Sequence, residues 1–147
     1  MSVEFKLEKL PKTDKMRQLI HSVLSSITFD GCSREPELCN LIADKFTQAD
    51  IEYIQEPILL IPADMTFRNH KKIVYHNNQY YYTSTPDFLL GSSVLEVKWK
   101  DKLSSADKGQ LVECLSCPDI DKVFLAFFRY PLNELSLYRI YSKLLLL

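Results

Sequence analysis

The sequence predicts a single mixed α/β domain of 147 residues. Two observations favour this class. Apolar residues recur at helical spacing near the N-terminus and in two later segments, whereas short β-branched and aromatic stretches lie between and after them. The hydrophobic fraction of 46% and the presence of only three glycines indicate a folded globule, and no repeat or flexible linker marks an internal boundary.

Two helices are expected in the first third of the chain. The first starts at Thr13, because apolar residues follow at helical spacing, namely Met16, Leu19, Ile20, Val23 and Leu24. The second starts after Ser33, a favourable N-cap residue. Pro36 is compatible with this helix because it falls in the first turn.

From residue 51 the chain changes to strand-like patterns. Residues 51–62, interrupted by Pro57, predict a bent or edge strand, and residues 72–84 predict two strand fragments around Asn77-Asn78. Gly91-Ser92 predicts a tight hairpin. A helix over residues 105–117 and a buried strand over residues 122–130 follow, and residues 134–147 fit either a strand or a short helix.

The predicted hairpin brings charged residues together. With Gly91-Ser92 at its centre, Asp87 lies opposite Glu96, and Lys98 shares their face. The other face carries only apolar side chains, namely Phe88, Leu90, Leu95, Val97 and Trp99. Two adjacent carboxylates repel each other, and a divalent cation such as Mg²⁺ relieves that repulsion. The alternative is a surface ion-pair cluster in which Lys98 neutralises both acids.

Pro86-Asp87, eight intervening residues and Glu96-Val97-Lys98 together resemble the PD-(D/E)xK nuclease signature. Size and layout are most similar to the small Holliday-junction resolvases of archaea and phages, and the resemblance covers residues 31–130. It implies a restriction-endonuclease-like fold, in which a mixed β-sheet flanked by helices forms an αβββαβ core, here with an extra N-terminal helix in an extension over residues 1–30. It further implies an endonuclease acting on nucleic acid, most readily DNA, often as a homodimer.

The resemblance also assigns roles to the motif residues. Asp87, Glu96 and the backbone carbonyl of Val97 are expected to bind Mg²⁺ or Mn²⁺, and Lys98 is expected to position the attacking water. Gln110 lies in a segment that resembles a Gln-Leu-x-x-Tyr element of some relatives, although Cys114 replaces the tyrosine. Gln110 is expected to assist by hydrogen bonding, and the alternative is an exposed helix glutamine.

The superfamily usually adds an acid from the first core helix, and Glu35 and Glu37 compete for this role. Glu35 lies within about 20° of Ile42 on the apolar face of the predicted helix, whereas Glu37 lies on the polar face. We therefore expect Glu35 to be catalytic, and Glu35 is also a further candidate metal ligand. The alternative is that both acids only stabilise the helix N-terminus.

Basic side chains near the motif are candidate phosphate contacts, namely Arg68, Lys71, Lys72, Lys100, Lys102 and Lys108. The net charge of −1 gives no general preference for nucleic acid, so the alternative is a set of solvated charges. The four cysteines, including the pair Cys114 and Cys117, are more typical of small buried residues than of a metal–thiolate site.

No secretion signal is visible, and the apolar runs are too short to span a bilayer. We therefore expect a soluble intracellular protein without a membrane partner, in the cytoplasm or nucleus, or in the host cytoplasm if the source is viral. Two other functions remain open: a catalytically silent nucleic-acid-binding module of the same fold, and an α/β interaction domain that is not a nuclease.

Overall fold

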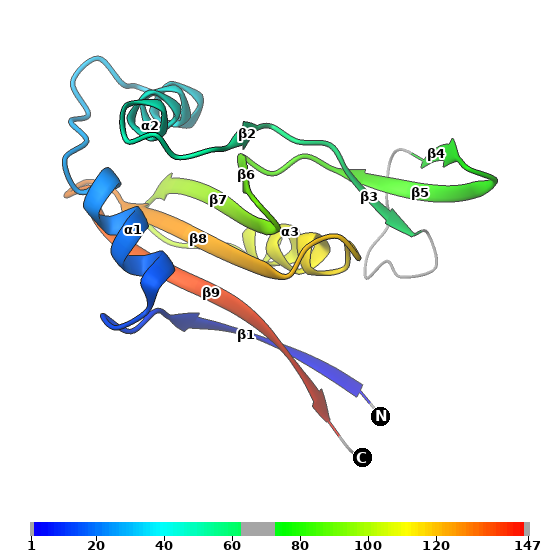
Figure 1. Ribbon diagram of the computed structural model, residues 1–147. Coiled ribbons are helices and arrows are strands. Elements are labelled where there is room, and N and C mark those ends of the chain that lie inside the picture. The colour runs from blue at the N-terminus through cyan, green and yellow to red at the C-terminus, as the bar shows by residue number, and fades with distance from the viewer. Residues whose placement is uncertain (1, 63–72, 146–147) are drawn as a thin grey trace.

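The computed structural model describes residues 2–62 and 73–145, and it confirms the mixed α/β class (Figure 1). The helices are α1 (Lys15–Leu24), α2 (Glu35–Gln48) and α3 (Ser105–Leu115). The large sheet contains, in spatial order, β1 (Ser2–Lys9), β9 (Glu134–Leu145), β8 (Lys122–Arg129), β7 (Ser93–Lys100), β6 (Phe88–Leu90) and β2 (Ile54–Gln55). The small sheet contains β3 (Leu59–Pro62), β5 (Gln79–Ser84) and β4 (Ile73–His76).

The large sheet is mixed. Strands β7 and β8 are parallel, and α3 forms the crossover that parallel neighbours require. The other pairings of the described strands are antiparallel. The small sheet extends from one end of the large sheet (Figure 1). No helix of the described residues is long and apolar enough to cross a membrane.

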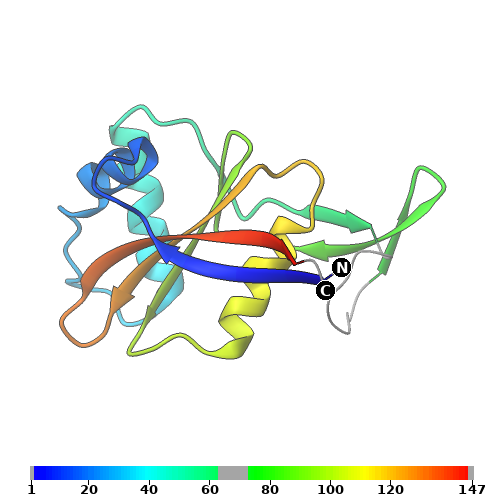
Figure 2. The ribbon, with the colours of Figure 1, turned by 90° about the horizontal axis from the view of Figure 1, so that it is seen from below.

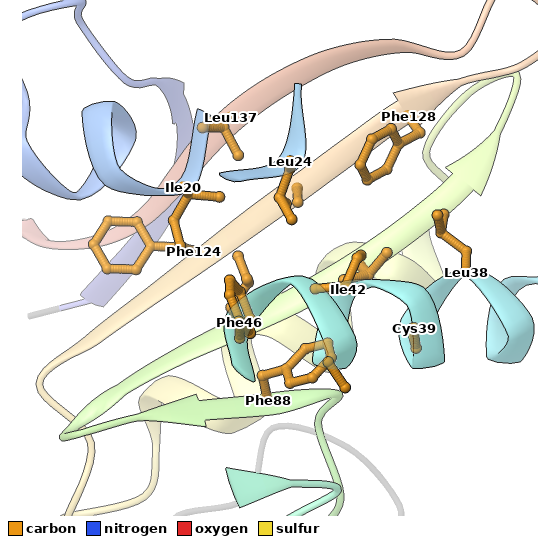
Figure 3. Close-up of a cluster of buried hydrophobic side chains, with 14 of the residues drawn as sticks. Ile20, Leu24, Leu38, Cys39, Ile42, Phe46, Phe88, Phe124, Phe128 and Leu137 are labelled. Atoms are coloured by element: carbon orange, nitrogen blue, oxygen red, sulfur yellow. The ribbon is translucent and has the colours of Figure 1, made fainter. Parts of the chain in front are cut away.

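Both faces of the large sheet are covered. Helices α1 and α2 pack on one face, and α3 packs on the other (Figures 1 and 2). Figure 3 shows the first core, where Leu24 and Phe46 meet Phe88 and Phe128 from the sheet. In the second core, Leu111 of α3 joins side chains of β8 and β3. Burial on both faces explains why β8 is a continuous apolar run rather than an alternating strand.

The helix starts differ slightly from the expected ones. Helix α1 is capped by Asp14, whose carboxylate accepts a hydrogen bond from the Arg17 amide. Helix α2 has Arg34 rather than Ser33 at its N-cap, and no side chain caps it. The Ser33 hydroxyl instead donates to the Glu37 carboxylate at 2.9 Å. Helix α3 starts at a capping box, in which Ser104 and Asp107 accept each other's backbone amide hydrogens.

Three segments depart from the expected layout. Residues 51–62 are not one bent strand but β2 and β3, which belong to different sheets, because Glu56 has a positive φ of 52° and Pro57 follows it. The N-terminal extension is not only helical, since β1 precedes α1 and pairs with β9. Residues 134–145, for which the sequence left strand and helix open, form β9.

The two predicted turns are confirmed. Asn77 and Asn78 have positive φ angles of 48° and 61° between β4 and β5. Gly91, with a φ of 64°, lies between β6 and β7. The register there pairs Phe88 with Leu95, as a hairpin centred on Gly91-Ser92 requires.

Two glycine substitutions are expected to change stability in opposite directions. At both Gly91 and Gly109 an added Cβ meets no atom within 4 Å, so packing does not decide the outcome. Gly91→Ala should lower the free energy of unfolding by about 1 kcal/mol, because its left-handed backbone disfavours L residues. Gly109→Ala, inside α3, should raise it by up to about 1 kcal/mol. Urea denaturation measures both values, and a loss of stability in both variants would contradict this account.

Candidate active site

The candidate site lies at the Phe88 end of β6, away from the Gly91-Ser92 turn. Strand β6 has three residues and β7 has eight, and their ladder stops at the Phe88–Leu95 pair. Strand β7 therefore continues beyond its neighbour, and the amides of Val97 and Trp99 on that edge need other acceptors.

Two side-chain carboxylates take the place of the missing strand. The Val97 amide donates to Oδ2 of Asp87 at 2.7 Å, and the Trp99 amide donates to Oε2 of Glu35 at 3.1 Å. Asp87 precedes β6 and Glu35 begins α2, so three elements meet at this edge. The two acids are therefore bound to alternate residues of β7, Val97 and Trp99, which lie about 7 Å apart along the strand.

Glu96 lies in the strand between these contacts and is buried, with 1% of its surface exposed. Its Oε1 accepts a hydrogen bond from the Asp87 amide at 3.1 Å. Its Oε2 is buried without a hydrogen-bond partner in the described part of the chain. Burial raises the pKa of Glu96 to about 10, together with the carboxylate of Asp87, which acts as a hydrogen-bond acceptor and as a negative charge, whereas the charge of Lys98 and the Asp87 amide oppose the shift. At neutral pH, without a cation, Glu96 therefore retains its proton.

The two helix acids differ as their spacing predicts. Glu35 is half-buried against β7, and burial is the main cause that raises its pKa. The Trp99 amide and the charge of Lys98 oppose this shift. Glu37 instead points to solvent. The hydrogen bond that its carboxylate accepts from the Ser33 hydroxyl lowers its pKa. Only Glu35 belongs to the candidate site.

Lys98 contacts polar groups of α3. Its ammonium donates to Oε1 of Gln110 at 3.0 Å and lies 3.7 Å from Oδ1 of Asp107. Gln110 is half-buried and is not the exposed helix glutamine of the alternative interpretation. The ion-pair alternative expected Lys98 to pair with Asp87 and Glu96, and the ion pair that the structure shows is with Asp107.

Asp107 is a site residue that sequence reasoning missed. It is buried, and its Oδ2 accepts hydrogen bonds from Nζ of Lys100 and from the Ser104 amide, both at 2.8 Å. Burial raises its pKa, but the hydrogen bonds from Lys100 and Ser104 and the charge of Lys98 outweigh this effect and lower the pKa to about 2. The spacing Ser104-x-x-Asp107 was the available signal, and it indicates only a helix start.

The candidate phosphate contacts are only partly placed. Arg68, Lys71 and Lys72 lie outside the described residues. Lys100 is half-buried and paired with Asp107, whereas Lys102 and Lys108 are exposed in the β7–α3 loop and in α3.

The cysteines are all free thiols. Cys39, Cys114 and Cys117 are buried, which supports their interpretation as small core residues. Burial raises the pKa of the Cys114 thiol to about 12, so this thiol remains protonated at neutral pH. Cys39 lies beside the acids of the site, and burial together with the charge of Asp87 raises its pKa as well.

The donor set fits a small hard cation. Among the described residues no group of three or more His, Cys, Asp or Glu side chains could hold a metal ion. Mg²⁺ usually requires only one or two carboxylates, together with waters and substrate phosphate. Asp87 and the buried, unpartnered Oε2 of Glu96 supply these two carboxylates. The residues present therefore fit Mg²⁺ or Mn²⁺ bound in part by the substrate.

No family model, curated protein or solved structure matches the chain. Function is therefore inferred from the chemistry of the site.

The raised pKa of Glu96 gives a stability prediction. The folded state holds this proton at pH values where the unfolded state, with an ordinary pKa of 4.5, has lost it. Stability from this group is thus complete below pH 4.5 and declines as pH rises through the folded-state pKa. In EDTA near neutral pH, Glu96→Gln should raise the free energy of unfolding by about 1–3 kcal/mol, because it removes a poorly solvated carboxyl.

Urea denaturation across the pH range measures this difference, which should vanish in acid. Glu37→Gln is the control, since the Glu37 pKa is lowered rather than raised and its side chain faces solvent. Added Mg²⁺ should stabilise the wild-type protein more than Glu96→Gln. A variant whose stability follows the wild-type pH curve would contradict the burial argument.

Asp107 should show the opposite dependence on pH. Because its folded-state pKa is lowered to about 2, its contribution is present at neutral pH and is lost as pH falls toward that value. Asp107→Asn should lower the free energy of unfolding at neutral pH by about 1.5–3 kcal/mol, the range for hydrogen bonds to charged groups. Asp101→Asn, at an exposed position, should change it by less than about 0.5 kcal/mol in the same denaturation experiment.

Proposed function

We propose that the chain is a divalent-metal-dependent nuclease that hydrolyses phosphodiester bonds of DNA. The observation that carries the proposal is the seating of Asp87 and Glu35 on the edge amides of β7, beside buried Glu96 and next to Lys98. Three acids and a lysine thus gather around one strand end, the residue types that metal-assisted hydrolysis of a phosphodiester needs.

The arrangement of elements supports a restriction-endonuclease-like core. Helix α2 carries the first acid, the β6–β7 hairpin carries the motif, and α3 leads into the parallel strand β8. The site lies beside the carboxyl ends of the parallel strands β7 and β8, where α/β proteins commonly bind ligands.

Asp87, Glu96 and the Val97 carbonyl would hold the cation. When bound, Mg²⁺ or Mn²⁺ supplies positive charge against the phosphate and lowers the pKa of water. Binding would displace the proton that Glu96 carries in its absence, so the cation would take over the relief of charge repulsion that protonation of Glu96 otherwise provides.

The remaining residues act on water and phosphate. Lys98 would position the attacking water and donate to a phosphate oxygen, and Gln110 fixes the ammonium through its 3.0 Å hydrogen bond. Glu35 is half-buried with a raised pKa, so it is suited to accept the proton of the attacking water. Three further lysines would contact neighbouring phosphates: Lys100 at the end of β7, Lys102 in the loop between β7 and α3, and Lys108 in α3.

Cleavage of labelled DNA tests the proposal. Junction, flap, duplex and single-stranded DNA, with RNA for comparison, are incubated with Mg²⁺, Mn²⁺ or EDTA. Cleavage is expected only with a divalent cation, because the acids hold the substrate through it. Glu96→Gln and Lys98→Met should each reduce the rate by about 100-fold or more.

Glu37→Ala is the matched control for Glu35→Ala, since both residues lie in the first turn of α2 but only Glu35 contacts β7. Glu35→Ala should slow cleavage and Glu37→Ala should not. Cleavage that persists in EDTA or in Glu96→Gln would refute the mechanism. Binding of DNA without cleavage of any substrate would instead indicate a silent binding module.

A further inference from the structure

A hollow of about 350 Å³ opens beside Glu35. It is lined by Cys32, Ser33, Arg34, Glu35, Trp99 and Tyr130. Its volume lies within the range of pockets that bind small ligands, roughly 300–1,000 Å³. Because Glu35 belongs both to this hollow and to the candidate active site, a group bound here would lie beside that site.

The indole of Trp99 forms a fixed wall of the hollow. Its Nε1 donates to Oδ1 of Asn133 at 2.8 Å, and the Phe29 ring packs at a centroid distance of 5.0 Å. The Trp99 amide is held by Glu35. With both backbone and ring anchored, the indole cannot easily turn to fill the space, so the hollow is preorganised for a flat ligand.

Tyr130 lies at the rim of the hollow and is exposed, with 57% of its surface accessible. Its ring meets Trp99 edge to face at a centroid distance of 6.5 Å. Tyr130 also lines a second hollow of about 330 Å³, which includes Asp101 and Leu132. The exposed ring thus borders two open spaces, as a stacking surface does.

Cationic groups accompany these rings. Arg34 is exposed at the rim of the first hollow, and its ion pair with Glu37 is long, at 3.5 Å, and solvent-facing. Arg129 borders the second hollow. Aromatic faces flanked by cations are the combination that binds unpaired nucleotides, because bases stack on the rings while the cations contact phosphates.

We infer that the hollow between Arg34 and Tyr130 binds one unpaired base of the substrate. The base stacks on Tyr130 against the fixed Trp99, and Arg34 contacts its phosphate. The inference rests on the proposed function and narrows it. Bases of a continuous duplex are paired and stacked, so the favoured DNA carries unpaired nucleotides beside the cleaved bond, as flaps and single-stranded overhangs do.

Trp99 provides a test that does not require cleavage, because it is the only tryptophan of the chain and it lines the hollow. Its fluorescence is followed in EDTA while a short oligothymidylate, or a blunt duplex of equal length, is added. Titration of N-acetyl-tryptophanamide corrects for absorption. We expect saturable quenching by the oligothymidylate at concentrations where the duplex has little effect.

Substitutions locate the binding site. Tyr130→Ala should weaken oligothymidylate binding about tenfold or more, because it removes a stacking partner, whereas Tyr130→Phe should retain it. Tyr75→Ala is the matched control: Tyr75 is 61% exposed and lies on β4, in the small sheet, and its loss should have no effect. Equal quenching by duplex and oligothymidylate, absence of quenching in the wild type, or unchanged affinity in Tyr130→Ala would overturn the inference.

The two proposals fail separately. Quenching that depends on Tyr130, without cleavage of any substrate, would support the base site and refute the nuclease. Efficient cleavage of continuous duplex, without quenching by oligothymidylate, would support the nuclease and refute the base site.

Discussion

The site depends on the shortness of β6, which covers only part of the edge of β7. Where β7 extends beyond β6, its edge amides need hydrogen-bond acceptors, because a buried unpaired amide destabilises the fold. Asp87 and Glu35 accept these hydrogen bonds. These hydrogen bonds serve two purposes. They complete the edge of the sheet, and they draw acids from two separate elements toward a third, Glu96, that lies within the strand.

Charge around the strand is divided between two sets of residues. Asp107 remains ionised and holds Lys98 and Lys100 on the α3 side, whereas Glu96 retains its proton on the side of β6. If Lys98 paired directly with Asp87 and Glu96, those oxygens would be less available to a cation. Because Asp107 takes this role, Oε2 of Glu96 has no hydrogen-bond partner among residues 2–62 and 73–145.

The parts of this site that follow local periodicity were predictable. Alternation along the hairpin placed Asp87 opposite Glu96, because a slip of one residue would put Asp87 beside the apolar side chains of Phe88 and Leu95. Helical phase placed Glu35 inward, because it lies on the same face of the helix as Ile42. Asp107 was not predictable, since its pairing with the lysines requires knowing how α3 lies against β7.

Long-range pairing was equally hidden in the fold. The split of residues 51–62 between two sheets depends on the backbone conformation of Glu56. The pairing of β1 with β9 joins the first and the last described strands along the chain. Neither follows from local sequence patterns, because the same residues fit several partners.

The pairing of β1 with β9 has a consequence for synthesis. Strand β1 leaves the ribosome before every other described element, yet its partner in the sheet is the last of them to appear. Until β9 is synthesised, β1 has no strand to pair with and its apolar face stays uncovered. Strand β8 also lacks one of its two neighbours. The sheet thus closes only after translation has passed the residues of the candidate site, so the nascent chain carries open strand edges that favour aggregation until β9 is made.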